Sequence, residues 1–394
     1  MKYKLEELCG YIARGIAPKY SDDSDFCVLN QKCVRDNNIH FANSRRHNNI
    51  EKKVSSDKTL RIYDILVNST GVGTAGRVAQ LKAVPKDYSA ITADSHVTII
   101  RPNPEQVHPE FLGYFLQYRQ PYIESLAKGS TGQTEISRDS ISNIEVDLPD
   151  AETQKKIVRI LSALDQKIEL NNQQSKVLET AAFTLYDDFI NTIDESNFKK
   201  VAIGQIADCK LGGTPSRAKT EYWGGGINWI NSGAINSFRI TEPSELITEE
   251  GFKHTSTYML PKGTTVLAIT GATLGQVSRM EIEGCANQSV IGIVGNSAIS
   301  NEYIYLTIVR NIQEIINRQT GGAQQHINKN DIKEFEIILP NQQLMNNFTN
   351  IVRPIFEKIA QNEFENKTLS SLRDALLPEL MSGEIDLNEV IINE

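Results

Sequence analysis

Hydrogen-bonding side chains stand next to glycines at several places in the sequence, where they could contact a polar ligand. Thr70 and Thr270 each precede a glycine, and Gln276 follows one. Glutamine can bond the edge of adenine at two points, and arginine or lysine can bond guanine or phosphate. The alternative for each residue is a structural role in a turn or cap. With nearby basic residues, the candidate set is Lys32, Arg35, Arg45, Arg46, Thr70, Arg77, Gln133, Arg138, Thr214, Ser216, Arg217, Asn231, Thr270, Gln276, Gln288, Gln324, Gln325, His326 and Lys329.

The turn Gly71–Gly76 has the formal pattern GxGxxG after a strand-like segment, with Asp94 further along the chain. A dinucleotide site of this kind needs a helix that begins at the glycines, so that the pyrophosphate meets its N-terminus. The residues that follow alternate in polarity and soon reach a proline, which suits a strand better. A tight glycine turn is the favoured interpretation, and a dinucleotide-dependent enzyme remains the alternative.

Other catalytic patterns are weak in this sequence. Asp150 and Glu152 resemble a nuclease carboxylate pair, but their place at a predicted helix start explains them as charges that favour the helix dipole. No GxxxxGK[ST] loop for ATP occurs, and no spacing singles out a nucleophile and its base. The five cysteines form no CxxC pair, so we expect buried thiols, no disulfide framework and no metal site.

The net charge of −8 argues by itself against nucleic-acid binding. Most of the net negative charge lies in residues 341–394, where four Lys and Arg stand against nine Asp and Glu. The globular parts are near neutral, which suits a DNA-binding protein whose partner adds positive charge. No apolar run approaches the roughly 18 residues that span a bilayer, and the first residues lack the apolar core of a signal peptide. We expect a cytoplasmic protein without membrane contact.

The chain carries an internal duplication. Residues 129–149 and 320–340 align without gaps and share six identities in 21 positions, among them Gln133 with Gln324 and Ile136 with Ile327. The same helical pattern follows both segments, which a duplication explains and coincidence does not. The predicted division is a domain over 1–149, a helical spacer over 150–198, a second domain over 199–340 and a second spacer over 341–394.

Each spacer has apolar residues at alternating intervals of four and three, which predicts a long helix packed on another helix. The apolar positions are Ile157, Leu161, Leu164, Ile168, Leu178 and Leu185 in the first spacer, and Phe348, Val352, Ile355, Ile359, Leu369 and Leu376 in the second. Asn171 and Asn362 stand mid-seam, where a polar residue fixes the register. We expect an antiparallel coiled coil with an internal near-twofold axis. Pro354 and Arg373 predict a local bend or looser pairing in the second helix.

The two domains show the same order of predicted elements, which indicates an α+β fold. The first domain opens with a helical pattern at Leu5, Leu8 and Ile12, continues with strand, glycine turn and strand over 64–84, and has a helix over 108–129. The corresponding segments of the second domain are 263–280 for the strands and 301–322 for the helix.

The whole chain resembles the specificity subunits of type I restriction–modification enzymes. The segments that carry the resemblance are VLNQKC at 28–33 with Ser44-Arg45-Arg46, GGTPS at 212–216, TEYWGGGINWI at 220–230, ITGATLGQV at 269–277, QQHINKNDIKEFEIILP at 324–340 and LLPELMSGEI at 376–385. The first domain departs from this pattern, because GIAPKYS replaces GGTPS and GVGTAG replaces GATLG. The correspondence of its turn residues with those of the second domain is therefore open.

The resemblance implies that each domain reads one half of an asymmetric, two-part target in double-stranded DNA. The paired helices would set the gap between the halves and dock two methyltransferase subunits, which carry S-adenosylmethionine and modify adenine. Motor-nuclease subunits would use ATP and Mg, and the chain itself would bind no cofactor and catalyse nothing. A coiled-coil scaffold that binds only protein is the remaining alternative.

Overall fold

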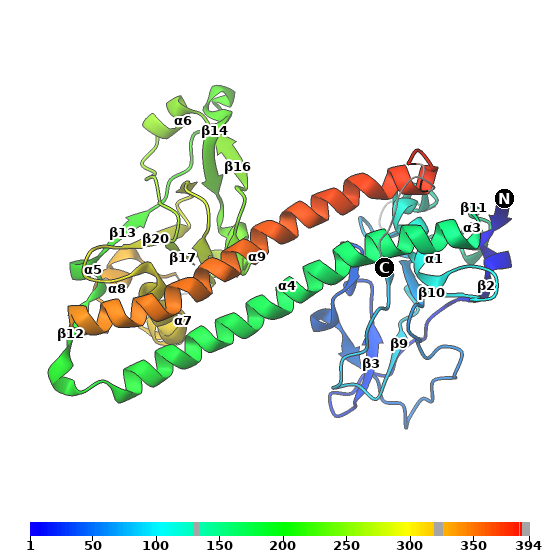
Figure 1. The fold of residues 1–394 in the computed structure, drawn as a ribbon, viewed down its shortest axis with the longest axis horizontal. Helices are drawn as coiled ribbons and strands as arrows, with labels where there is room; N and C mark the ends of the chain where they lie inside the picture. The colour runs from blue at the N-terminus through cyan, green and yellow to red at the C-terminus, as the bar shows by residue number, and fades with distance from the viewer. Residues whose placement is uncertain (130–133, 319–325, 386, 388–394) are drawn as a thin grey trace. The chain divides into compact units, whose positions relative to one another are not determined.

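The structure of the chain is a computed structural model that describes residues 1–129, 134–318, 326–385 and 387. It divides into two compact units, of which the first comprises Met1–Gln166 with Ser370–Glu394 and the second Lys167–Leu369. Two long helices, α4 (Ala151–Thr192) and α9 (Gln342–Ser382), contribute residues to both units (Figure 1).

The first unit is built on two sheets. The main sheet is antiparallel, in the order β2 (Cys9–Arg14), β10 (Val97–Pro102), β7 (Ile65–Asn68) and β8 (Val78–Gln80). A smaller sheet has the order β6 (Arg45–Arg46), β3 (Phe26–Leu29) and β9 (Ala90–Ala93), and β3 runs parallel to β9. Short pairs join β1 (Lys2–Lys4) to β11 (Glu145–Asp147) and β4 (Val34–Arg35) to β5 (Asn38–Ile39). The helices are η1 (Leu5–Leu8), η2 (Phe41–Asn43), α1 (Pro109–Tyr118), α2 (Gln120–Ser125) and α3 (Arg138–Ser142).

The second unit repeats this topology. Its main sheet has the order β13 (Ala207–Leu211), β20 (Val290–Gly295), β17 (Thr265–Ala268), β18 (Val277–Met280) and β15 (Arg239–Ile240). Its smaller sheet has the order β16 (Glu245–Ile247), β14 (Trp223–Ile230) and β19 (Cys285–Ala286), again with a parallel pair, and β12 (Phe198–Ala202) joins β21 (Glu336–Pro340). The helices are η3 (Glu195–Asn197), α5 (Ile203–Ile206), η4 (Thr220–Tyr222), η5 (Ser232–Asn236), α6 (Glu249–Lys253), η6 (Gly271–Thr273), α7 (Asn301–Asn317) and α8 (Lys329–Lys333).

The backbone bonds identify which turn residues correspond in the two copies. Gly15 donates to the carbonyl of Val97, and Gly212 donates to that of Val290, so GIAPKYS takes the place of GGTPS. Gly76 donates to the Asn68 carbonyl as Gly275 does to Ala268, which aligns the two glycine turns. The duplication seen in the sequence is therefore also present in the folded backbone, although the main sheet of the second unit has the additional edge strand β15.

The long helices pair in opposite directions within each unit. In the second unit the ring of Phe189 near the end of α4 stacks on Phe348 near the start of α9, with the ring centroids 4.7 Å apart. In the first unit Asp165 of α4 accepts a hydrogen bond from Arg373 of α9 at 3.0 Å. Within the second unit Asn171 bonds to Asn366 whereas Phe189 stacks on Phe348. Later residues of α4 therefore meet earlier residues of α9, so the pairing is antiparallel. Pro354 does not interrupt α9.

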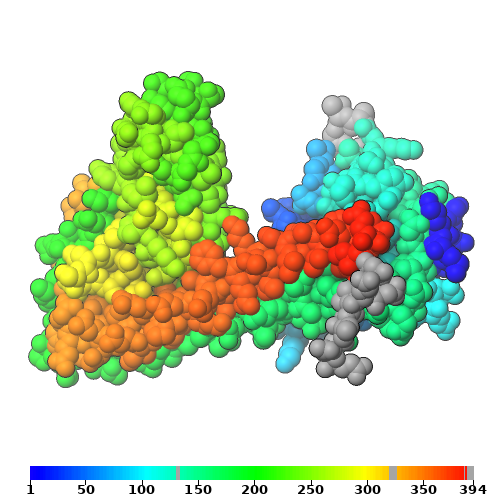
Figure 2. All heavy atoms as spheres, turned by 45° about the horizontal axis from the view of Figure 1, so that its top comes forward, coloured from blue at the N-terminus to red at the C-terminus, as the bar shows by residue number. Residues whose placement is uncertain are grey.

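Each unit shares its hydrophobic core with the long helices. In the first unit, Ile157 and Leu161 of α4 and Leu380 of α9 join the core that contains Phe111 of α1. In the second unit, a core around Tyr303 of α7 includes residues of both long helices. The space-filling view shows this second globular part resting directly on the first half of α9 (Figure 2). The helices are part of each fold rather than attachments to it.

Two expectations about short helices were wrong. Ile12 lies in strand β2, because residues 9–14 bond to β10, and only Leu5–Leu8 form a helical turn. The helix expected over 108–129 is divided into α1 and α2. Pro121 has no N–H to continue the bonding of α1, and it stands instead in the first turn of α2, where proline is tolerated.

Candidate nucleic-acid interface

The loops that follow β3, β7 and β9 converge at one end of the first unit. Thr70, after β7, lies 2.7 Å from His96 Nδ1 and donates to Gln31 Oε1 at 3.4 Å. Gln31 follows β3 and His96 follows β9, which are parallel neighbours, so their side chains emerge at the same edge. The buried Asn68 donates to the Gln31 carbonyl at 2.9 Å and holds this loop in place. We name Gln31, Thr70 and His96 the strand-end cluster.

The same edge of the second unit carries different side chains. Thr214 donates a hydrogen bond to the exposed Gln288, which follows β19. Thr270 and Gln276 flank the turn between β17 and β18, and Gln276 is exposed. The Asn231 side chain accepts from Gly233 N at 2.8 Å, so it caps the short helix η5 and serves the loop itself. Thr214, Gln276 and Gln288 thus present hydrogen-bonding groups here.

A close backbone approach places these loops. A Cβ atom on Gly212 would lie 2.2 Å from the Asn287 carbonyl oxygen, and one on Gly15 would lie 2.0 Å from that of Ala93. Real contacts of that length do not occur, so both positions require glycine. The glycine lets the GGTPS turn lie against the loop after β19, which brings Thr214 to Gln288.

Arg217 projects beside this turn on an aromatic support. Its guanidinium carbon lies 3.6 Å from the ring centroid of Trp223, and Trp223 Nε1 donates to the Ser216 carbonyl at 3.3 Å. Two nitrogens of Arg217 donate to the Glu245 carboxylate at 2.7 and 2.6 Å, and these bonds lower the pKa of Glu245. Stacking and a bidentate pair hold the guanidinium plane in one orientation, as phosphate or guanine recognition requires.

The predicted basic residues of the first unit fall into three environments. Arg45 stacks on Tyr20 at 3.4 Å, and Arg46 donates to the Ser24 carbonyl at 2.7 Å; both are exposed on β6. Lys32 is exposed in the loop after β3, whereas Arg35 pairs with Asp36 at 3.3 Å. Arg77 donates to the Gly73 carbonyl at 3.0 Å and supports the glycine turn.

Arg138 and Lys329 occupy duplicate positions, as the first residues of α3 and α8. The positive end of the helix dipole disfavours a cation there. The side chains of Ser137 and Asn328 cap these helices. His326, just before Lys329 in the chain, is exposed, whereas Gln133, Gln324 and Gln325 lie outside the described residues.

The structure contradicts the dinucleotide alternative. Gly71, Gly73 and Gly76 have φ of +112°, +71° and +91°, which makes this a tight turn. Strand β8 follows it and pairs antiparallel with β7, so no helix begins where a pyrophosphate would bind.

The seam between the long helices has a polar layer. Asn171 donates to Asn366 Oδ1 and to Glu365 Oε2, both at 2.9 Å, and Asn362 donates to Ser175 Oγ at 3.2 Å. Both asparagines, at 171 and 362, are almost completely buried. The twelve apolar residues expected to pair the helices are all buried or half-buried.

Other chemistry finds no support in the described part of the chain. No group of three or more His, Cys, Asp and Glu side chains there is arranged to hold a metal. Burial raises the pKa of Cys33 to about 12 and those of Cys209 and Cys285 to about 11, so these thiols stay protonated. Within the same residues no helix is long and apolar enough to cross a membrane.

Comparison with known proteins agrees with this geometry. The family model described as "Type I restriction modification DNA specificity domain" matches the chain twice, over residues 1–180 and 195–371. The chain belongs to this family. The two matches coincide with the two copies of the fold, so each copy is one specificity domain and its function is DNA sequence recognition.

Individual relatives also match most of the chain. The type I restriction enzyme HindI specificity subunit of Haemophilus influenzae is 25% identical over 381 residues, covering 77% of this chain and 83% of its own. The MjaIX specificity subunit of Methanocaldococcus jannaschii is 24% identical over 375 residues, covering 88% and 84%. The crystal structure of the S subunit from M. genitalium has the same fold, with a TM-score of 0.61 at 17% identity over 96% of this chain and 95% of that one.

Proposed function

We propose that the chain is the recognition subunit of a type I restriction–modification complex and that each domain reads one half of a two-part target. The proposed division keeps domains at 1–149 and 199–340, with helical spacers at 150–198 and 341–394. The loops at the ends of β3, β7 and β9, and their counterparts in the second domain, would contact base edges. Arg45, Arg46, Arg138, Arg217 and Lys329 would contact phosphates.

One observation carries this proposal. The two domains share a backbone bonded in the same way, yet their loop side chains differ at corresponding positions. His96 of the first domain corresponds to Ser289 of the second, and Ala17 corresponds to Thr214. An unchanged scaffold with changed hydrogen-bonding groups is what two different half-sites require.

The long helices have two tasks in this proposal. An α-helix rises about 1.5 Å per residue, so the seam from 157 to 189 would act as a spacer of about 48 Å. The helices would also dock two methyltransferase subunits, which carry S-adenosylmethionine. Motor-nuclease subunits would bring ATP and Mg, and this chain would contribute recognition without catalysis.

The test is single-molecule sequencing of adenine methylation in cells that express this chain together with a cognate methyltransferase subunit, and in cells that express either protein alone. We expect a two-part methylated motif that requires both proteins. A motif that persists without this chain would contradict the proposal.

A protein-only scaffold predicts a different result. In that case Arg45→Ala, Arg46→Ala and Lys329→Ala would leave DNA retention by the assembled complex unchanged. We expect these substitutions to weaken retention, because each removes a phosphate contact.

A further inference from the structure

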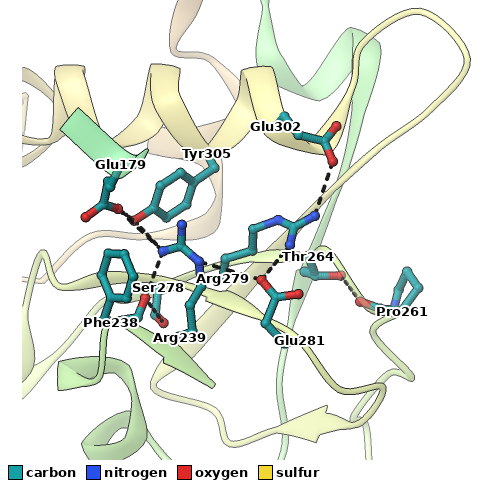
Figure 3. Close-up of polar contacts among 10 residues, drawn as sticks. All are labelled: Glu179, Phe238, Arg239, Pro261, Thr264, Ser278, Arg279, Glu281, Glu302 and Tyr305. Atoms are coloured by element: carbon teal, nitrogen blue, oxygen red, sulfur yellow. Dashed lines mark hydrogen bonds and ion pairs between the residues drawn. The ribbon is translucent and has the colours of Figure 1, made fainter. Parts of the chain in front are cut away.

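A group of mostly buried charged side chains joins the globular part of the second unit to α4 (Figure 3). Phe356 of α9 packs against the same group. At its centre lies Arg239 of β15, whose side chain is completely buried. Its Nη1 donates to the Tyr305 hydroxyl of α7 at 3.1 Å and to the Glu179 carboxylate of α4 at 3.4 Å. Tyr305 donates in turn to Glu179 at 2.8 Å. The Arg239 guanidinium therefore links strand β15 and helix α7 of the globular part to the long helix α4.

A second arginine extends the group toward α9. Arg279 of β18 donates to Glu281 at 2.5 Å and to Glu302 of α7 at 3.2 Å. The completely buried Glu281 also lies 3.6 Å from Arg239 Nε. Phe356 of α9 lies against both guanidinium groups. Its ring centroid is 5.5 Å from the guanidinium carbon of Arg239 and 5.2 Å from the guanidinium carbon of Arg279. We name the whole group the arginine seat: Glu179, Arg239, Arg279, Glu281, Glu302, Tyr305 and Phe356.

Burial of the charged groups in the arginine seat carries a large desolvation cost. Three arginine nitrogens and one carboxylate oxygen, namely Arg239 Nε and Nη2, Arg279 Nε and Glu281 Oε2, are buried without a hydrogen-bond partner in the described structure. Apolar side chains of the same volume would hold the globular part at least as firmly. Apolar faces tolerate sliding and rotation, however, whereas charge-assisted hydrogen bonds require one geometry. The seat therefore selects an orientation rather than adding net stability.

In the first unit, a different group of polar side chains joins the globular part to the long helices. Asp165 of α4 accepts from Lys82, Tyr114 and Arg373 at 2.5, 2.7 and 3.0 Å. Tyr114 occupies the position that duplicates Tyr305, and both tyrosines donate to a carboxylate of α4. At other duplicate positions the residue types change, with Glu281 in place of Lys82 and Phe356 in place of Asp165. Both domains thus contact the helices through directional hydrogen bonds and ion pairs, but the residues that form these bonds differ between the two domains.

We propose that the arginine seat fixes the orientation of the second recognition domain on the helix pair and so restricts the DNA target to one gap length. This inference rests on the proposed function. The helices set how far apart the domains stand, and the seat prevents the domain from tilting to reach a half-site one base pair nearer or farther. The residues that carry it contact no DNA and act as positioning residues.

The test compares adenine methylation motifs for the full chain, with its methyltransferase subunit, in wild type and variants. Glu281→Gln keeps the side-chain volume and removes the charge that both arginines share. We expect methylation at gaps one base pair shorter or longer to rise about tenfold, the ratio that one lost charge-assisted hydrogen bond corresponds to. Base preference within each half-site should stay as in wild type.

The test includes a second variant within the arginine seat and a control variant outside it. Glu179→Gln, at a partly exposed position on α4, removes the charge that strengthens the hydrogen bonds from Arg239 and Tyr305. Because Glu179 lies outside the core, this variant provides the test if Glu281→Gln fails to fold. Asp187→Asn breaks an exposed ion pair that also joins α4 to α7, through Arg310, and should leave the gap unchanged. A single gap length in both seat variants would overturn this inference alone. If wild type yields no two-part motif, the proposed function itself fails.

Discussion

Asn171 donates a hydrogen bond to Asn366 across the antiparallel helices at 2.9 Å, and both residues are at most 9% exposed. This pair lies in a seam whose other layers are mostly apolar. A helix pair held by apolar contacts alone can shift by a heptad, whereas a buried amide pair is satisfied in one alignment only. The polar layer therefore specifies register, at some cost in stability.

The first prediction concerns this layer. Asn171→Leu alone should lower the melting temperature, because Asn366 Oδ1 and Glu365 lose their donor while Asn366 stays buried. Asn171→Leu combined with Asn366→Leu should recover most of the loss, since both partners are then apolar. A loss of about 2 kcal/mol for the single variant corresponds to roughly 4–8 °C. Thermal unfolding measures both, and a double variant that is less stable than the single one would contradict the argument.

The second prediction concerns acid. Burial alone would raise the pKa of Asp165, but Lys82, Tyr114 and Arg373 outweigh it and the pKa is lowered. A carboxyl whose pKa is lower in the folded state contributes stability above its unfolded value, and this contribution is lost as the pH falls through the folded value. Asp165→Asn should therefore be less stable than wild type at pH 7, and the difference should shrink below about pH 4. Calorimetry at several pH values measures the difference, with Asp187→Asn as the exposed control.

The third prediction concerns Arg217. Arg217→Ala should weaken binding of the assembled complex to its target and reduce the salt slope by about one charge. Glu245→Gln should have the opposite effect, because it releases a guanidinium that Trp223 still supports. Titrations at two salt concentrations distinguish the two variants. Equal weakening by both would show that the arginine acts only through its pair with Glu245.

The fourth prediction concerns Gly212. Gly212→Ala should cost about 3 kcal/mol, because the new Cβ would meet the carbonyl oxygens of Ala286 and Asn287. Gly226 is the matched control, since a Cβ there meets nothing within 4 Å. Methylation sequencing should show loss of the second half-site for Gly212→Ala and an unchanged motif for Gly226→Ala. Comparable stability of the two variants would exclude the close approach as the reason for this glycine.

Elements that follow from a repeating sequence pattern could be predicted. Contacts between residues that lie far apart in the sequence could not. The seam and the strand–turn–strand segments have periodicities that neighbouring residues impose, and the structure contains these elements. Gln31 and His96 were missed because each is unremarkable beside its own neighbours and gains a role only when parallel strands bring it to Thr70. Arg239 and Glu179 are 60 residues apart in the sequence, and only the fold shows that they share a partly buried hydrogen bond.

The different residues that join each domain to the long helices limit how such a chain can exchange its parts during evolution. If recombination moved the first globular domain to the second position with a boundary at the start of the helices, Lys82 would face Phe356 and lose the carboxylate of Asp165. An exchange that carried the adjoining helical turns along would preserve the ion pair. Modular shuffling of such domains is thus favoured at crossover points inside the helices rather than at the edge of the globular part.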